Sequence, residues 1–302
     1  MNSFNLAIKN NTWILILLAI SFSLIFPQIG TLLKPLLSPL LMALMFLSCL
    51  DLRLPQITQS LADYKNISLS LVIVHLVSPL IVLLLRPLFS EEIFLGLIIA
   101  SVMPAGRSSV FLSNIYGGSP VNALVTSSIS NAISPIAVPL LVFLLAHTSI
   151  KINPVEIGST IFYMVIIPLI AGVLFGKSSA GAKLNKFSSS FSAVILILII
   201  IGIISPVQSI IVSQPSLIIS LVFLVTSLIS INFFLGKLLG NNPKNNITYA
   251  LTSSYKNYTL GTLICLTLFS PVVALPSLAY TISNNLLLIP LQLFLKHDQS
   301  QK

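Results

Sequence analysis

Long apolar stretches alternate with short polar breaks along the whole chain. A transmembrane helix needs about 20 mostly apolar residues, and many stretches here reach or approach that length with few charges. The breaks contain the proline, glycine and charged residues that punctuate helices, as in Lys34-Pro35 and Gly117-Gly118-Ser119-Pro120. The pattern predicts ten spans, at residues 12–31, 36–50, 67–88, 93–117, 120–146, 156–176, 188–206, 216–240, 247–269 and 271–295.

The composition supports an all-α polytopic membrane protein. Hydrophobic residues make up 56% of the 302 residues and charged residues only 7%, whereas a soluble domain carries roughly 25% charged residues. A soluble enzyme, a disordered chain and a disulfide scaffold are therefore excluded. The net charge is +9, but the basic residues are scattered singly, so we expect no nucleic-acid partner. Cys49 and Cys265 lie in apolar runs, and His75, His147 and His297 have no ligand spacing, so no metal site is expected.

The lysine and arginine residues are unequally divided between the two sides that ten spans define. With an even number of spans both termini share a side, and that side holds ten basic residues against three on the other. Loops rich in lysine and arginine remain in the cytoplasm, so both termini are predicted to be cytoplasmic. The ten are Lys9, Arg53, Lys65, Lys177, Lys183, Lys186, Lys237, Lys244, Lys296 and Lys302, and the three are Lys34, Arg86 and Lys151.

The second half of the chain repeats a pattern of the first. Residues 119–124 (Ser-Pro-Val-Asn-Ala-Leu) resemble residues 270–275 (Ser-Pro-Val-Val-Ala-Leu), and the offset of 151 residues is half the chain. Five spans in each half are an odd number, so the halves enter the membrane in opposite directions, as in many secondary transporters. The pattern predicts two inverted five-helix repeats, residues 1–150 and 151–302, in one membrane domain. A chance match between apolar sequences is the alternative.

Two basic residues lie inside predicted spans rather than in loops. Arg107 falls within the fourth span and Lys256 within the ninth, where a cation costs about 3 kcal/mol on insertion scales and normally faces a cavity or a partner. Pro104 and Gly106 predict a break in the fourth helix, and residues 252–259 form a polar island in the ninth. The repeat makes these two spans equivalent, and paired broken helices are where transporters bind substrate. Snorkelling of the two side chains to the interface is the alternative.

Two cations at one site in the membrane predict an anionic substrate. The six acidic residues all lie in loops or at span ends, so the substrate must supply the counter-charge unless Lys256 is neutral. A guanidinium suits a carboxylate, which favours a small organic anion as the partner. Polar residues near the cations complete the predicted substrate site, although hydroxyls also serve as contacts between membrane helices. The predicted site consists of Arg107, Ser108, Ser109, Ser127, Asn131, Thr252, Ser254, Lys256 and Asn257.

These residues and motifs resemble the bile acid:sodium symporter family over most of the chain. Residues 104–109 (Pro-Ala-Gly-Arg-Ser-Ser) resemble the family's Pro-Gly-Gly-x-x-Ser-Asn crossover, and Leu37 to Leu54 resembles its second helix. Tyr255-Lys256-Asn257 and residues 269–276 resemble its ninth and tenth helices. The resemblance implies ten helices in two inverted repeats, with the fourth and ninth broken and crossing, and transport by alternating access.

The sequence departs from the family at the positions that bind sodium. The resemblance implies a site made by a Ser-Asn pair, fifth-helix hydroxyls, and a Glu and a Gln on the ninth helix. A hard cation prefers such oxygen ligands, yet here the carboxylate is missing and an ammonium group is added. We therefore expect Lys256 to stand where sodium would bind, with transport independent of sodium or linked to protons, and sodium-coupled symport as the alternative. The corresponding positions are Ser109, Val110, Ala123, Ser127, Thr252 and Lys256.

Two further classes of protein compete with a carrier. An intramembrane enzyme would need a nucleophile and a base, for which Ser109 and Lys256 form the one available dyad; the rest of such a site is missing, so we expect no enzyme and no resident cofactor beyond a coupling Na⁺ or H⁺. A channel would not show saturable counterflow, whereas a carrier would. The identity of the substrate and the oligomeric state do not follow from the sequence.

Overall fold

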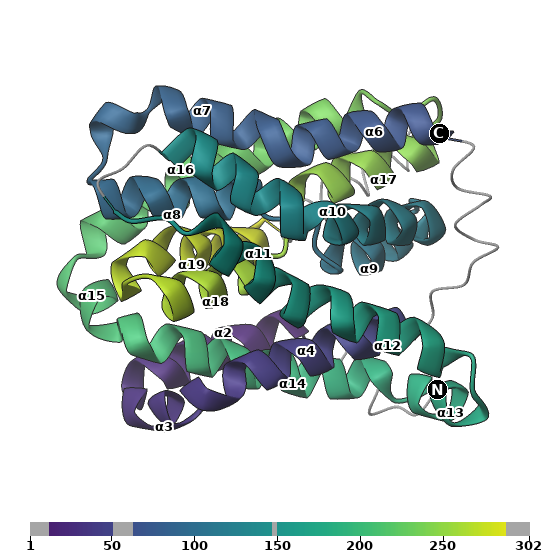
Figure 1. Ribbon diagram of the computed structural model, residues 1–302, viewed down its shortest axis with the longest axis horizontal. Coiled ribbons are helices and arrows are strands. Elements are labelled where there is room, and N and C mark those ends of the chain that lie inside the picture. The colour runs from purple at the N-terminus through teal and green to yellow at the C-terminus, as the bar shows by residue number, and fades with distance from the viewer. Residues whose placement is uncertain (1–11, 51–62, 147–149, 288–302) are drawn as a thin grey trace. The chain divides into compact units, whose positions relative to one another are not determined.

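The computed structural model describes residues 12–50, 63–146 and 150–287 (Figure 1). Within these ranges the chain is helical and has no β-strand, and each of the ten predicted spans contains helix. The all-α fold class is confirmed. Among the described helices, five are long and apolar enough to cross a membrane: Tyr64–Leu84, Pro120–Ala146, Pro154–Gly176, Ser190–Ser213 and Pro215–Lys237. The apolar helices Lys34–Cys49 and Tyr258–Leu268 are shorter.

Several residues used in the sequence predictions lie outside the described residues. Lys9, Arg53, Lys296 and Lys302, which contribute to the charge count, are among them, as are both termini. His147 and His297 are also outside the described part of the chain. The cytoplasmic orientation of the termini therefore stays a prediction.

The chain forms two compact units, and each combines segments from both halves of the sequence. The first unit contains residues 1–53 and 160–215. In it α14 packs against α2 and α4, and α12 packs against α4. Its helices are α2 (Thr12–Ile25), α3 (Pro27–Leu32), η1 (Lys34–Leu36), α4 (Leu37–Cys49), η5 (Phe162–Ile166), α12 (Ile167–Gly176), α13 (Ser179–Asn185), α14 (Ser188–Ile204), η6 (Ser205–Val207) and α15 (Gln208–Ser213).

The second unit contains residues 54–159 and 216–302 and holds both predicted broken helices. Helix α19 packs against α8 and α18, and α10 packs against α8, α9 and α17. Its helices are α6 (Tyr64–Val72), η3 (Ile73–Val77), α7 (Ser78–Leu84), η4 (Arg86–Leu88), α8 (Glu91–Val102), α9 (Ser108–Ile115), α10 (Pro120–Ala146), α16 (Pro215–Lys237), α17 (Pro243–Ser254), α18 (Tyr258–Leu268) and α19 (Pro271–Leu286). Helix α11 (Pro154–Ile161) begins in this unit and ends in the first.

Local sequence explains where several of these helices begin. Proline occupies the first position of α10, α16, α17 and α19, where its missing N–H costs no helical hydrogen bond. Side chains cap other starts: the Ser90 hydroxyl accepts from the Ile93 N–H, and the Asn242 side chain accepts from the Asn245 N–H. These signals are local, so the sequence places the helix starts well.

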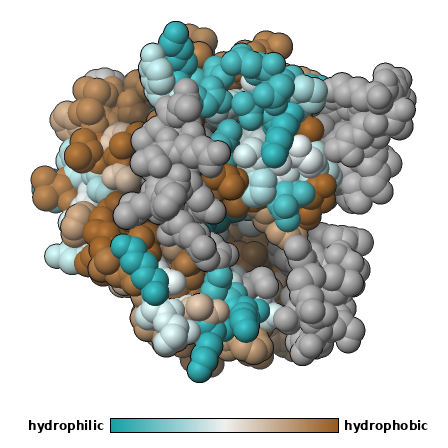
Figure 2. All heavy atoms as spheres, turned by 90° about the vertical axis from the view of Figure 1, so that its right-hand side faces the viewer, coloured by the Kyte–Doolittle hydropathy of each residue, from teal (hydrophilic) through white to brown (hydrophobic). Residues whose placement is uncertain are grey.

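Large apolar side chains are exposed on the helices of the second unit. Leu84, Ile136 and Phe223 each expose more than three quarters of their surface, which in water would be unfavourable. In the face shown in Figure 2, hydrophobic side chains cover broad areas and hydrophilic side chains gather in patches. Apolar surface of this kind is what the hydrocarbon core of a membrane contacts.

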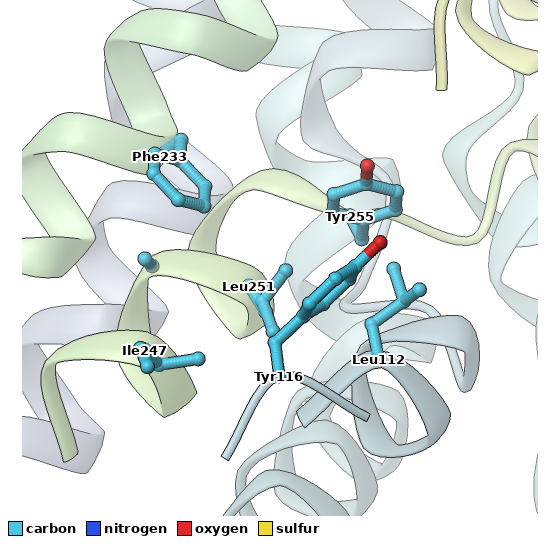
Figure 3. Packing of buried hydrophobic residues seen from close by; sticks show 7 residues of the cluster. Leu112, Tyr116, Phe233, Ile247, Leu251 and Tyr255 are labelled. Carbon is cyan, nitrogen blue, oxygen red and sulfur yellow. The ribbon is translucent and has the colours of Figure 1, made fainter. Parts of the chain in front are cut away.

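A buried apolar cluster fixes α9 against α17 and α16. Tyr255, which follows the last residue of α17, places its ring among these side chains, beside the ring of Tyr116 (Figure 3). The cluster therefore anchors the backbone at the point where α17 ends. It consists of Leu112, Tyr116, Phe233, Ile247, Ala250, Leu251 and Tyr255.

Candidate functional site

The fourth and ninth predicted spans are both interrupted. Helix α8 ends at Val102 and α9 begins at Ser108, while α17 ends at Ser254 and α18 begins at Tyr258. Pro104 lacks the N–H that would continue α8, as the sequence predicts. The second break contains no proline. There the Asn257 N–H does not continue α17 but donates to the carbonyl of Pro104, in the other break, at 2.7 Å.

Hydrogen bonds between the backbones join the two breaks directly. The Gly106 N–H donates to the Tyr255 carbonyl at 2.7 Å, and together with the bond from Asn257 it makes an antiparallel bridge between Ala105 and Lys256. A Cβ atom at Gly106 would lie 2.6 Å from the Lys256 carbonyl oxygen, so the close approach requires glycine. Ala105 and Lys256 are 151 residues apart, which is the offset of the predicted repeat.

The amine of Lys256 is buried and points at backbone carbonyls. The residue is 3% exposed, and its Nζ donates to the carbonyl of Val74 at 2.6 Å and to the carbonyl of Ser101. A solvent-facing lysine would instead keep its charged end in water. The sequence places Lys256 in a substrate site, whereas in the structure the protein itself supplies oxygen partners for the amine.

Two helix defects leave these carbonyls available. Val74 lies in the π-helix η3, where the partner of its carbonyl would be the N–H of residue 79, and Pro79 has none. The Ser101 carbonyl would normally accept from the Ala105 N–H in an α-helix. That N–H donates instead to the hydroxyl of Ser130 at 2.9 Å. The lysine amine thus donates to two carbonyls that have no N–H partner in their own helices.

Helix α10 supplies two polar side chains to the first break. The Asn131 amide, a predicted site residue, donates to the carbonyl of Ala105 at 2.9 Å and to that of Ser127 at 2.7 Å. Ser130, a hydroxyl of the fifth span that the predicted site leaves out, accepts from the Ala105 N–H. His75 was also missed: its ring nitrogens lie 3.0 Å from the Val102 carbonyl and 3.0 Å from the Ser130 hydroxyl. The available signal was an isolated histidine within an apolar span.

Four of the five predicted hydroxyl residues are buried and bond to nearby backbone carbonyls. Ser109 donates to Gly106 at 2.7 Å, Ser127 to Leu124 at 3.1 Å, and Thr252 to Thr248 at 3.0 Å. Ser254 likewise donates to the carbonyl of Ala250. Such bonds occupy the hydroxyl hydrogen and leave the oxygen lone pairs as acceptors. Within the described residues the Ser109 hydroxyl donates to the Gly106 carbonyl and the Lys256 amine donates to the Val74 carbonyl, so the two side chains do not form a nucleophile-base dyad.

Exposure separates two of the predicted site residues from the rest. Arg107 is partly exposed and Ser108 is exposed at the start of α9, whereas the other seven are buried. No side chain caps this helix start. The equivalent start of α18 is capped by the side chain of Asn257, which accepts from the Leu260 N–H. The start of α9 is therefore more exposed than the start of α18.

Acidic groups lie away from the two breaks in the described part of the chain. Glu91 and Glu92 are in the first turn of α8, and Glu156 is in the first turn of α11. Asp63 precedes α6 and accepts from the Tyr249 hydroxyl and the Asn245 amide. Of the predicted sodium positions, Val110 and Ala123 have no side-chain oxygen. Among the described residues, therefore, no carboxylate lies at the breaks, where it could bind a cation or neutralise Lys256.

Two interrupted helices joined inside a membrane protein and surrounded by buried polar side chains are typical of secondary transporters. A family model described as the Sodium Bile acid symporter family matches residues 38–227. The chain belongs to this family and is an integral membrane transporter, not an enzyme. Sequence reasoning reached the same family and the same class of protein.

Two curated proteins of Bacillus subtilis (strain 168) are similar to this chain. The first, described as an uncharacterized sodium-dependent transporter YocS, is 23% identical over 281 residues, covering 91% of this chain and 86% of the relative. The second, described as an uncharacterized protein YbaS, is 24% identical over 188 residues, covering 60% of this chain and 61% of the relative.

Proposed function

We propose that the protein is a secondary carrier of small organic anions, carboxylates in particular, that works by alternating access without sodium. The single observation that carries this proposal is the contrast between the two cations at the breaks. Arg107 is partly exposed at an uncapped helix start, whereas Lys256 is buried with its amine on backbone carbonyls. In this proposal Arg107, at the more exposed position, meets the substrate, and Lys256 takes the place of a coupling ion.

The start of α9 has the chemistry that recognises a carboxylate. The guanidinium of Arg107 offers paired N–H donors to a carboxylate, and the exposed hydroxyl of Ser108 lies next to it in the chain. A helix N-terminus adds N–H donors and a favourable dipole. Lys256 adds its positive charge to the same proposed site. The other members of the site are the buried polar residues Ser109, Ser127, Asn131, Thr252, Ser254 and Asn257.

The carbonyl pair around Lys256 supports independence from sodium. Backbone carbonyls are ligands for a hard monovalent cation, and the ammonium group already donates to those of Val74 and Ser101. A second cation beside it would meet like-charge repulsion with no carboxylate to offset it. Release of a proton from Lys256 would empty this position of charge, so a proton is the coupling ion that the site accommodates.

Sodium-coupled symport is the second candidate. The name of the family and the description of the relative YocS as a sodium-dependent transporter favour it. The hydroxyl oxygens of Ser109, Ser127 and Thr252 keep lone pairs that a sodium ion could use.

Uptake into proteoliposomes decides between these candidates. Labelled pyruvate, succinate, benzoate and taurocholate are the probes, offered with an inward gradient of sodium chloride or of choline chloride. We expect saturable uptake and counterflow at equal rates in both salts, with stimulation by an inward proton gradient if Lys256 is the proton site. Strong stimulation by sodium alone would contradict the proposal in favour of sodium symport, and the absence of counterflow would indicate a channel.

The inverted repeat is part of the same proposal. The starts of α4 and α14, of α6 and α16, and of α10 and α19 each differ by 151 residues. The bridge between Ala105 and Lys256 and its two hydrogen bonds exchange under the same offset. Both observations support two five-helix repeats, residues 1–150 and 151–302, with a pseudo-two-fold axis through the bridge.

An even number of spans would put both termini on the same side of the membrane, and we propose that this side is the cytoplasm. The excess of lysine and arginine on the side that contains Lys65, Lys177, Lys183, Lys186, Lys237 and Lys244 supports this orientation. We expect a green fluorescent protein fused to the C-terminus to fluoresce and an alkaline phosphatase fused there to be inactive. The reverse pattern would refute the cytoplasmic location of the C-terminus.

A further inference from the structure

The polypeptide between α8 and α9 is held by side chains of other helices. The Ser101 carbonyl accepts from Lys256, and the Ala105 carbonyl accepts from Asn131. The Val102 carbonyl lies 3.0 Å from Nδ1 of His75. The Ala105 N–H donates to Ser130. An interrupted helix cannot satisfy these groups by itself, and unsatisfied backbone groups are costly in a membrane. The position of this segment therefore depends on its side-chain partners.

His75 has a central place among these partners. The residue is 5% exposed in the π-helix η3, and its Nδ1 lies 3.0 Å from the Val102 carbonyl. Because a carbonyl only accepts, Nδ1 must carry a hydrogen. Ser130 accepts from the Ala105 N–H, so its own hydrogen is available for Nε2, which lies 3.0 Å away. A neutral ring with its hydrogen on Nδ1 satisfies all three contacts at once.

We propose that His75 is a positioning residue, which through Ser130 holds the Ala105 N–H and through Nδ1 holds the end of α8. Arg107 lies two residues after Ala105, so these contacts fix the backbone from which its guanidinium extends. The neighbouring residue Val74 supplies the carbonyl for Lys256. Two consecutive residues of η3 thereby fix the positions of both cations. This role adds to the proposed function. It rests on that function only for the statement that Arg107 binds the substrate.

Hydrogen exchange of the purified protein, followed by mass spectrometry of peptides that cover residues 103–110, tests the proposal without a substrate. His75→Phe removes both nitrogens and keeps a ring, and Ser130→Ala removes the link to Ala105. We expect each substitution to raise the exchange rate of this segment by about 10-fold or more. Without these hydrogen bonds, local opening of the segment costs less free energy. Peptides of α19 should remain unchanged.

Matched variants separate positioning from general loss of structure. Ser283→Ala removes a buried hydroxyl of the same unit, which donates to the Val222 carbonyl, and should leave residues 103–110 unchanged. His75→Gln carries an amide that reaches the Nε2 position, and should restore exchange to within about 3-fold of the original protein. If His75→Phe does not fold, Ser130→Ala and His75→Gln carry the test.

Unchanged exchange at residues 103–110 in both His75→Phe and Ser130→Ala would overturn the proposal. An equal rise across α19 would also overturn it, because it would mean a general structural role. Failure of the proposed carboxylate transport would leave these exchange rates unaffected, so the two failures are distinguishable.

Discussion

Replacement of Arg107 by alanine is expected to weaken carboxylate binding by about 100-fold. Charge-assisted hydrogen bonds contribute about 1.5–3 kcal/mol each, and a bidentate guanidinium makes two of them. Arg107 is partly exposed at the start of α9, and in the proposed function it is the cation that contacts the substrate. The measurement is the thermal shift that pyruvate, succinate, benzoate or cholate produces on the purified protein.

Two matched variants sharpen this prediction. Arg86→Ala removes an exposed arginine of the same unit, whose guanidinium lies 5.4 Å from the centre of the Phe94 ring, and should leave the carboxylate-induced shift intact. Arg107→Lys keeps the charge but loses the planar fork, so an intermediate shift is expected. A full shift in Arg107→Ala would remove Arg107 from the substrate site.

Replacement of Lys256 is expected to destabilise the second unit and to expose a position for a free cation. Both Lys256→Met and Lys256→Ala leave the carbonyls of Val74 and Ser101 without their donor, at a cost of about 1–3 kcal/mol for each buried group. We expect the apparent melting temperature to fall by roughly 5–10 °C in choline chloride. Thermal unfolding followed by size-exclusion chromatography measures the change.

The two substitutions should differ in their response to sodium. Alanine opens space beside the carbonyls, whereas methionine fills it with an apolar chain. We therefore expect sodium chloride to restore part of the stability of Lys256→Ala but not that of Lys256→Met, and to leave the unmodified protein unchanged. Lys237→Met, at the end of α16, is the control for loss of a charge. Equal stability of all three variants in both salts would show that the amine does not occupy a cation position.

Much of the fold is predictable from the sequence because it depends on local properties. Apolar length determines which segments cross a membrane, and proline at the first turn determines where α10, α16, α17 and α19 begin. The break after α8 follows from Pro104, whose missing N–H is a property of one residue. The pairing of the two breaks was also predictable, because the repeat made the fourth and ninth spans equivalent.

The roles of the two cations were not predictable in the same way. From the sequence Arg107 and Lys256 look alike, as basic residues in apolar spans. The structure separates them: one is partly exposed, and the other donates to carbonyls 182 and 155 residues away in the chain. Which carbonyl is available depends on the π-helix before Pro79 and on the diversion of the Ala105 N–H to Ser130. Neither defect can be seen from Lys256 itself.

The sequence by itself thus determined the class of protein, the helical spans, the interrupted fourth helix and the residues that carry positive charge into the membrane. Only the tertiary structure decided that the carbonyls of Val74 and Ser101 satisfy the Lys256 amine, and that His75 and Ser130 bond to the polypeptide at the first break. The physical reason is that burial in a membrane requires every polar group to find a partner, and the partner is chosen by packing among helices distant in the chain.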